Sequence, residues 1–233
     1  MVIPAYNEAR RVPSYLEEVA AYFEGRGEPH EIIVVDDGSA DDTAGAALAV
    51  AESHPAIRVL RREVNEGKGG AVRRGMLAAR GACRLFTDAD GSTPIAELKR
   101  LEPHLLVGAD VVIGSRGLPD PAVAVVARPH RVLAGRLFTR LVALAGLGGI
   151  ADTQCGFKVF TAAAAERLFR LLVTTGFAFD VELLLRARAA GLRVVEVPVN
   201  WTHRPGSKVG VLRDGPAMLR EIVKARRTVR RSP

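Results

Sequence analysis

The stretch Glu31-Ile-Ile-Val-Val-Asp-Asp-Gly-Ser39 contains a short, almost wholly apolar run that ends in two acids. A run of this length and composition is typical of a strand that is buried on both faces, as the strands of parallel sheets are. The next residues, Asp41-Asp-Thr43, predict the start of an Ala-rich helix that extends to about Ser53, because acids and threonine are favoured at helix caps. This stretch therefore predicts a strand followed by a helix.

The same order of strand and helix recurs throughout the first half of the chain. Further strands are predicted at residues 2–3, 57–60, 84–87 and 110–114, and further helices at about 8–25, 67–80 and 95–106. Such alternation predicts an α/β fold with a single Rossmann-like, mostly parallel sheet that is flanked by helices. Ligands of these sheets bind at the carboxyl ends of the strands.

The second half of the chain is less regular. Residues 119–129 form a Pro/Ala/Val stretch whose length suits a mobile active-site loop. We expect helices at 130–146, 161–172 and 180–190, a strand at 194–200, and a basic helix from about 214 to 230.

The chain has 233 residues and a net charge of +7, and most of the excess positive charge lies between Arg204 and Pro233. Nucleic acid, an anionic membrane surface and phosphorylated ligands are all compatible partners for such charge, and a solvated helix without a partner is the alternative. Basic charge without interleaved aromatic residues argues against dedicated nucleic-acid binding. We predict one catalytic domain over residues 1–211 and a basic C-terminal helix over 212–233 that lies peripherally on a membrane.

Two features bear on the cellular compartment. Cys83 and Cys155 show no spacing pattern, so we expect free thiols in a cytoplasmic protein. We also expect neither a signal peptide nor a membrane-spanning helix, because no apolar run reaches the roughly 18–20 residues that a bilayer requires.

The clearest candidate site is Asp88-Ala-Asp90, which directly follows a predicted buried strand. Two carboxylates at this position need a partner, since an isolated buried charge is costly. A divalent cation is one possible partner, and oxygen ligands favour Mg²⁺ or Mn²⁺. The alternative is a turn in which both acids cap the following helix.

Other polar residues follow the neighbouring strands. Asp36 and Asp37 form a second acid pair, which could bind a base or a ribose hydroxyl or could simply form a turn. Lys68 lies in a glycine-rich segment before a helix and could contact a diphosphate, although the spacing is that of neither a Walker A loop nor a dinucleotide-binding loop.

Cationic side chains come later in the sequence. Arg116, His203, Arg204 and Lys208 could stabilise the negative charge of a departing diphosphate. For each lone arginine a solvent-facing position is the alternative. Asp180 and Glu182 lie at the start of a predicted helix, where an acid is favoured by the helix dipole, and one of the two could instead serve as a catalytic base.

Several motifs occur in the same order as in family 2 glycosyltransferases, which the chain resembles over almost its whole length. These motifs are 2–8, 34–43, 65–75, 88–90, 114–116, 152–158 and 201–208. The resemblance implies the GT-A fold, and within the family the later motifs are most similar to the branch that glycosylates polyprenyl phosphates.

The resemblance also implies roles for individual residues. A donor site is implied for Pro4, Tyr6, Glu8, Asp36, Asp37, Lys68, Asp88, Ala89 and Asp90, with the metal at Asp88 and Asp90. Phosphate contacts are implied for Arg116, Lys158, His203, Arg204 and Lys208. The residues expected to act in catalysis are Asp90, Arg116 and Asp180, although a phosphate acceptor is already anionic and needs little help from a base.

Together these features predict a metal-dependent, inverting transfer of a hexose to a polyprenyl phosphate of the dolichyl type, and we expect the hexose to be glucose from UDP-glucose. Two alternatives remain open at this stage. One is a transferase that uses GDP-mannose or a soluble acceptor, and the other is a non-enzymatic module that binds nucleotides or polyanions.

Overall fold

The computed structural model describes residues 1–126, 142–204 and 211–231. The helix predicted over 130–146 therefore lies largely outside the described residues, and Lys208 lies outside them too.

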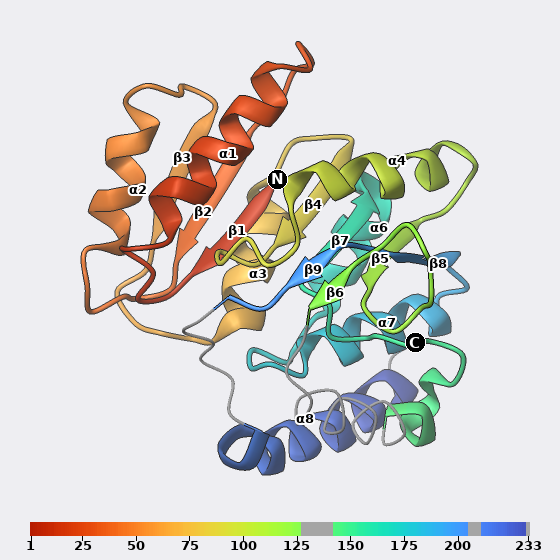
Figure 1. The fold of residues 1–233 in the computed structure, drawn as a ribbon. Helices are drawn as coiled ribbons and strands as arrows, with labels where there is room; N and C mark the ends of the chain where they lie inside the picture. The colour runs from red at the N-terminus through yellow and green to blue at the C-terminus, as the bar shows by residue number, and fades with distance from the viewer. Residues whose placement is uncertain (127–141, 205–210, 232–233) are drawn as a thin grey trace.

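A seven-stranded sheet forms the centre of the molecule, with the strand order β3-β2-β1-β4-β7-β5-β8 (Figure 1). Its strands are β1 (Val2–Ala5), β2 (Ile32–Asp36), β3 (Ile57–Arg61), β4 (Cys83–Thr87), β5 (Val111–Ser115), β7 (Phe157–Thr161) and β8 (Val194–Pro198). Among these strands β7 alone is antiparallel to its neighbours, and it separates β4 from β5. The predicted mostly parallel sheet is thus confirmed, whereas β7 was not predicted.

Helices cover both faces of the sheet, as predicted. One face carries α1 (Val12–Glu24), α2 (Thr43–Ala51) and α4 (Leu98–Leu106), which follows a short 3₁₀ turn, η1 (Ile95–Glu97). The other face carries α3 (Lys68–Ala78), η2 (Ala143–Leu147), α6 (Ala162–Leu171), α7 (Phe179–Ala189) and α8 (Val211–Arg231).

Alternation along the strands explains why the sheet is covered twice. Successive side chains of a strand point to opposite faces. Val2 of β1 packs into the core beneath α3, while Ile3 packs into the core beneath α1. In β2, Ile33 packs on the same face as Val2 and Ile32 on the same face as Ile3, and all four side chains are fully buried.

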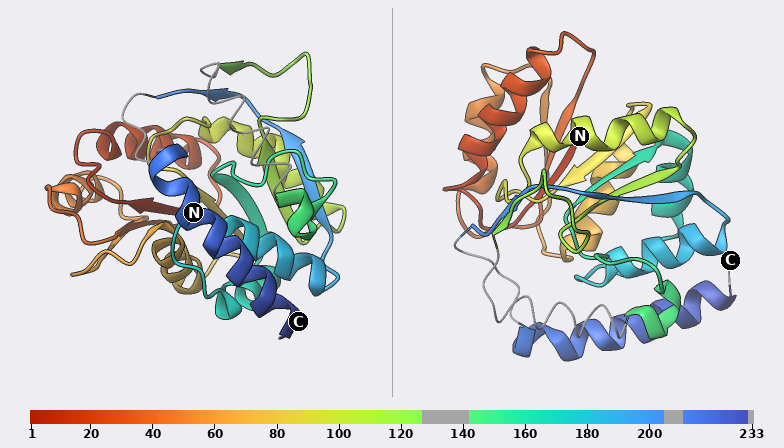
Figure 2. Two further views of the ribbon diagram at one scale, coloured as in Figure 1. Left: turned by 90° about the horizontal axis from the view of Figure 1, so that it is seen from below. Right: turned by 45° about the vertical axis from the view of Figure 1, so that its right-hand side comes forward.

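The basic helix α8 lies across the outer side of the α3–α7 layer (Figure 2). Its inner residues Ile222, Ala225 and Val229 are buried in the same core as the sheet. Only 4% of Ile222 is exposed, so it is not available for membrane contact, whereas Val223 is 51% exposed. Across the described ranges, no helix combines the length and the apolar character needed to cross a bilayer.

A small second sheet connects distant parts of the chain. The strand β6 (Val125–Val126) lies in the segment expected to be a loop, and it pairs in parallel with β9 (Trp201–Thr202). Because β9 also binds Ser92 through the Thr202 N–H, at 2.9 Å, this pairing holds residues 124–126 next to the segment that follows Asp90.

Candidate active site

The polar segments predicted after the strands meet at one edge of the sheet. The strands β1, β2, β4 and β5 are parallel, so their carboxyl ends point the same way. The antiparallel β7 begins at this edge, which adds residues 152–156 to it.

The loops after β1 and β2 are joined by hydrogen bonds. The Asn7 side-chain oxygen accepts a bond from the Ala40 N–H at 2.8 Å, and the Glu8 N–H donates to the Thr43 hydroxyl at 2.7 Å. These contacts hold Asn7 in the left-handed region, at a φ of 50°, and leave Tyr6 38% exposed at the rim of the edge. Pro4 lies within β1 and is buried.

Asp36 and Asp37 are both almost fully buried, and each accepts hydrogen bonds from nearby backbone. Asp36 accepts a bond from the Ser39 N–H at 3.1 Å, which is the turn considered as an alternative. Asp37 accepts bonds from the N–H groups of Glu66 at 3.1 Å and Gly67 at 2.8 Å. Burial raises the pKa of Asp37, although the Gly67 N–H and Arg62 oppose that shift.

The Asp37 contacts place Lys68 in the site. Lys68 follows Gly67 directly, and its Nζ lies 2.5 Å from an oxygen of Asp88. Burial lowers the pKa of Lys68, but the carboxylates of Asp88 and Asp180 outweigh this effect and raise it. Asp37 and Asp88 therefore lie at the same edge, connected through a single short segment.

Asp88 has a second close neighbour, Gly156, which comes just before β7. The backbone N–H of Asp88 donates to the Gly156 carbonyl at 3.1 Å. A Cβ at position 156 would lie 2.2 Å from the Asp88 carboxylate, so a glycine is required for this approach.

Asp90 faces a tight turn, and its carboxylate accepts a hydrogen bond from the Ser92 N–H at 2.9 Å. The residue between the acids, Ala89, is buried. The turn depends on Gly91, whose φ of 63° suits glycine and whose Cα lies against the ring of Tyr15.

A buried ion pair lies directly beneath this edge. The Lys158 Nζ is 2.6 Å from Asp180 and donates a second bond, also of 2.6 Å, to the Cys155 carbonyl. The side chains are 0% and 3% exposed. Burial raises the pKa of Asp180, while Lys158 and Lys68 act in the opposite direction. Lys158, which we expected to contact phosphate, instead has its ammonium group bound within the protein.

Arg116 forms a bidentate ion pair with Asp152. Its Nε and Nη2 lie 2.6 and 2.9 Å from the two carboxylate oxygens, and its backbone N–H donates to the same group at 3.0 Å. The guanidinium also lies 5.4 Å from the centre of the Trp201 ring. Burial opposes both shifts, but Arg116 lowers the pKa of Asp152 and Asp152 raises the pKa of Arg116.

The remaining predicted residues lie beside Trp201. The His203 N–H donates to the Val126 carbonyl at 3.0 Å, and its ring is 6.2 Å from that of Trp201. Arg204 is exposed at the end of the described segment. The structure thus brings His203 and Arg116 to the same side of the edge, around one indole ring.

Asp88 and Asp90 are the residues of this edge that could hold a divalent cation. Both are oxygen donors, which fits Mg²⁺ or Mn²⁺. Within the described residues, no group of three or more Asp, Glu, His or Cys side chains converges on a metal position. Such a cation would therefore complete its coordination with ligand oxygens and water, as Mg²⁺ usually does.

Asp152 and Gly156 were not among the predicted site residues, and Glu182 was predicted only as an alternative catalytic base. Asp152 orients Arg116, and Gly156 allows Asp88 to approach β7. Glu182 binds the N–H groups of Val173 and Thr174, at 3.1 and 2.7 Å, and so shapes the segment that supports α3. Asp152 lies in the motif 152–158, which resembles that of family 2 glycosyltransferases, and this motif is the sequence signal that could have identified it.

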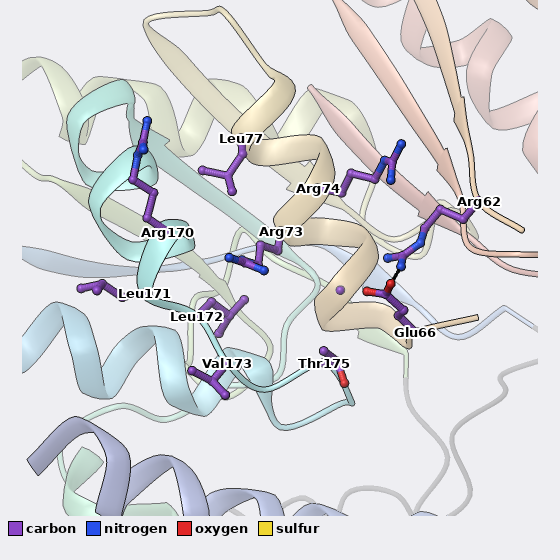
Figure 3. Close-up of a pocket in the computed structure, with 11 residues that line it drawn as sticks. Arg62, Glu66, Arg73, Arg74, Leu77, Arg170, Leu171, Leu172, Val173 and Thr175 are labelled. Carbon is purple, nitrogen blue, oxygen red and sulfur yellow. Dashed lines mark ion pairs between the residues drawn. The ribbon is translucent and has the colours of Figure 1, made fainter. Parts of the chain in front are cut away.

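A cavity of about 640 Å³ lies apart from these residues, between α3 and the segment after α6 (Figure 3). Its lining includes none of the predicted site residues, although it shares the segment between Arg62 and Gly70 with the site.

The order of the strands and the polar loops at their carboxyl edge place the chain among the α/β proteins that bind ligands at this edge of the sheet. The family model described as Glycosyl transferase family 2 matches residues 1–169, and the chain belongs to this family.

Curated relatives carry a more specific description. The chain is 44% identical over 223 residues to a dolichyl-phosphate beta-glucosyltransferase of Drosophila melanogaster, covering 90% of this chain and 68% of the relative. It is 41% identical to the protein ALG5C of Trichomonas vaginalis, which has the same description, covering 90% of this chain and 65% of the relative. The human counterpart is 37% identical over 225 residues, which cover 90% of this chain and 68% of the relative. The chain thus spans about two thirds of the length of these relatives.

Solved structures support the GT-A fold. Glucosyl-3-phosphoglycerate synthase from Mycobacterium tuberculosis in complex with UDP has a TM-score of 0.70 and 24% identity, covering all of this chain and 79% of that one. A second structure of the same enzyme, in complex with Mn²⁺, UDP-glucose and glycerol 3-phosphate, has a TM-score of 0.67 and 24% identity, covering 96% of this chain and 76% of that one.

Proposed function

We propose that the chain transfers glucose from UDP-glucose to a polyprenyl phosphate of the dolichyl type, with inversion at the anomeric carbon. The observation that carries the proposal is the meeting of Asp88 and Asp90 with the cation Lys68 at the carboxyl edge of the sheet. The descriptions of the curated relatives support both the sugar and the acceptor.

Asp88 and Asp90 would hold Mg²⁺ or Mn²⁺. When bound, the cation supplies a Lewis acid that neutralises the charge of the departing diphosphate. Lys68, which pairs with Asp88, would then be available to a diphosphate oxygen once the metal takes over the carboxylate.

The donor would lie along the loops after β1 and β2. Tyr6 presents an exposed aromatic side chain at the rim, and Pro4, Glu8 and Asp36 lie directly behind it. Asp37 would act mainly by fixing Gly67, because both of its oxygens already accept backbone hydrogen bonds.

The acceptor phosphate would meet the cations around Trp201. Arg116 is oriented by Asp152 and carries N–H groups toward this region, while His203, Arg204 and Lys208 belong to the segment that follows β9. Because a phosphate monoester is already anionic, attack on the anomeric carbon requires positioning more than deprotonation. Asp180 would serve as a counter-ion for Lys158, and both would act on the site through its electrostatics.

The membrane would be reached peripherally. The outer face of α8 carries exposed Arg220, Lys224 and Arg227 beside exposed Leu219 and Val223. Basic side chains interspersed with apolar ones favour anionic lipid surfaces.

A soluble acceptor is the second candidate. The likeness to a synthase whose solved complexes hold phosphoglyceric acid or glycerol 3-phosphate favours a small phosphorylated acceptor. The cationic environment of Arg116 suits either acceptor.

The test is transfer from UDP-glucose or GDP-mannose, supplied separately with Mn²⁺, to a short polyprenyl phosphate or to 3-phosphoglycerate. We expect transfer from UDP-glucose to the lipid phosphate, and a decrease of at least about a hundredfold in Asp90→Asn, since a metal ligand is lost. Glu18→Gln removes one negative charge from an exposed position of α1 and should transfer normally. Transfer that requires 3-phosphoglycerate, or that is unchanged in Asp90→Asn, would contradict the proposal.

A further inference from the structure

The cavity between α3 and the segment after α6 is lined by four arginines and one glutamate, together with an apolar wall. The charged residues are Arg62, Glu66, Arg73, Arg74 and Arg170, and the apolar residues are Leu77, Leu171, Leu172 and Val173. Its charge is therefore strongly positive, and its polar and apolar parts lie side by side (Figure 3).

The arginines differ in how far they are already engaged. Arg73 reaches from α3 toward α6, where its Nε donates to the Phe169 carbonyl at 3.0 Å, which leaves its terminal nitrogens for other partners. Arg170 binds Glu166, and Arg62 is paired with Glu66 and lies 3.7 Å from Asp37. Arg74 is exposed, and no partner for its guanidinium is found among residues 1–126, 142–204 and 211–231.

The apolar wall is open to solvent where it meets the arginines. Leu171 is 43% exposed and Val173 is 50% exposed, while Leu172 is buried. The segment is rigid in its backbone, because Glu182 accepts the N–H groups of Val173 and Thr174. Exposed aliphatic side chains next to guanidinium groups form a surface that neither a purely polar nor a purely apolar ligand would satisfy.

We propose that this cavity binds the phosphate headgroup and the first chain carbons of an anionic phospholipid. Guanidinium groups bind phosphate through two parallel charge-assisted hydrogen bonds. Arg73 supplies such a group on the side of α3 that faces α6, whereas Arg74 points to the other side of the helix (Figure 3). The hydrocarbon lies on Leu171 and Val173, so that their exposed apolar surface is removed from water.

This site is separate from the proposed transfer site. No residue of its lining is placed at the acid pair, and the lipid that binds here does not react. The two sites share the segment 62–70, which contains Glu66 and Lys68. When a headgroup binds, Arg62 would leave its ion pair with Glu66 and pair with the phosphate instead. The cavity would thus hold the enzyme on a membrane by a defined headgroup contact, in addition to the diffuse attraction of α8.

The experiment measures binding of soluble dihexanoyl phosphatidic acid to the full chain by calorimetry. Dihexanoyl phosphatidylcholine and glycerol 3-phosphate serve as comparison ligands. We expect phosphatidic acid to bind at least about tenfold more tightly than either comparison ligand. Phosphatidylcholine lacks a monoester phosphate, and glycerol 3-phosphate lacks the acyl chains.

Variants locate the binding. Arg73→Gln should weaken phosphatidic acid binding by about tenfold, as expected for the loss of one charge-assisted phosphate contact. Arg167→Gln removes the same charge from an exposed position of α6 outside the cavity and should leave binding unchanged. Val173→Ser should weaken the binding of phosphatidic acid and leave that of glycerol 3-phosphate unchanged.

Three results would overturn the proposal. Equal losses in Arg73→Gln and Arg167→Gln would show that the attraction is diffuse. Equal affinity for glycerol 3-phosphate would assign the cavity to a soluble phosphate ester. Absence of binding to the correctly folded wild-type chain would show that the cavity takes no phosphate ligand.

Discussion

At the scale of single residues, the site is organised by carboxylates that fix cations. Asp152 fixes Arg116, Asp88 fixes Lys68, and Asp180 fixes Lys158. Each pair satisfies charges that would otherwise be costly to bury. The cations are therefore held in place before any anionic substrate arrives.

The pair of Arg116 and Asp152 yields the first prediction. Asp152→Asn should lower the free energy of unfolding by about 2 kcal/mol, because hydrogen bonds to charged groups contribute roughly that amount. It should also reduce transfer, since Arg116 is no longer oriented. Urea unfolding measures the free energy of unfolding, and the transfer assay measures the activity.

The matched control is Glu28→Gln, which breaks the exposed ion pair between Glu28 and Arg26. This change should cost less than about 1 kcal/mol, as exposed pairs do. Similar losses of stability in the two variants would mean that the Arg116 pair is merely a surface contact.

Sequence reasoning found most of the residues that carry charge but not their partners. Lys158 and Asp180 were both singled out, and yet their pairing depends on β7 lying next to β4, which no local pattern indicates. Lys158 was consequently assigned to phosphate. A fully buried lysine can be recognised only when the acid that neutralises it is known to be adjacent.

At the scale of secondary-structure elements, the start of α3 links the two sides of the site. Gly69 and Gly70 donate to the Thr175 carbonyl, at 2.7 and 3.2 Å, so that α3 begins in contact with the loop before α7. A Cβ on Gly69 would lie 2.6 Å from the Phe179 Cβ and from the Thr174 carbonyl oxygen. Lys68 reaches Asp88 because this close approach is possible.

The second prediction follows from that approach. Gly69→Ala should destabilise the protein by roughly 1–3 kcal/mol, as overpacking does, and should weaken donor binding by displacing Lys68. Gly148→Ala is the control, because a Cβ there would meet no described residue within 4 Å. Thermal unfolding and donor titration compare the stability and the donor affinity of the two variants. A Gly69→Ala protein as stable as Gly148→Ala would contradict the close approach of Gly69 to Phe179.

The elements themselves were predicted well where the period of the sequence was clear. The first-half strands and helices lie within a few residues of their predicted bounds, since each strand is short, apolar and followed by a polar turn. The exceptions are β7 and β6. The run Phe157–Thr161 includes a lysine and follows a glycine, and β6 is only two residues long and depends on its pairing with β9.

At the scale of the whole molecule, α8 completes the core that the sheet and α7 begin. Ile222, Ala225 and Val229 belong to the same buried cluster as Val2 of the first strand. Glu221 also accepts the Ala178 N–H at 3.1 Å, which attaches α8 to the start of α7. The last helix therefore stabilises the domain in addition to carrying the exposed basic residues Arg220, Lys224 and Arg227.

The third prediction uses two adjacent residues of α8. Ile222→Asp should destabilise the protein by at least about 3 kcal/mol, because a charge is placed in the core without a partner. Val223→Asp, at an exposed position, should have little effect on unfolding and should weaken binding to anionic vesicles. Chemical unfolding and vesicle sedimentation separate the two effects, and equal stabilities would mean that α8 does not pack as described.

The central claim is that Asp88 and Asp90 bind a divalent cation together with a sugar nucleotide at the carboxyl edge of the sheet. The most direct measurement is a titration with Mn²⁺, followed by electron paramagnetic resonance, with and without UDP. The account predicts that UDP tightens Mn²⁺ binding in the wild-type chain and that Asp90→Asn abolishes this effect. Mn²⁺ uptake that is indifferent to UDP, or that is unchanged in Asp90→Asn, would contradict it.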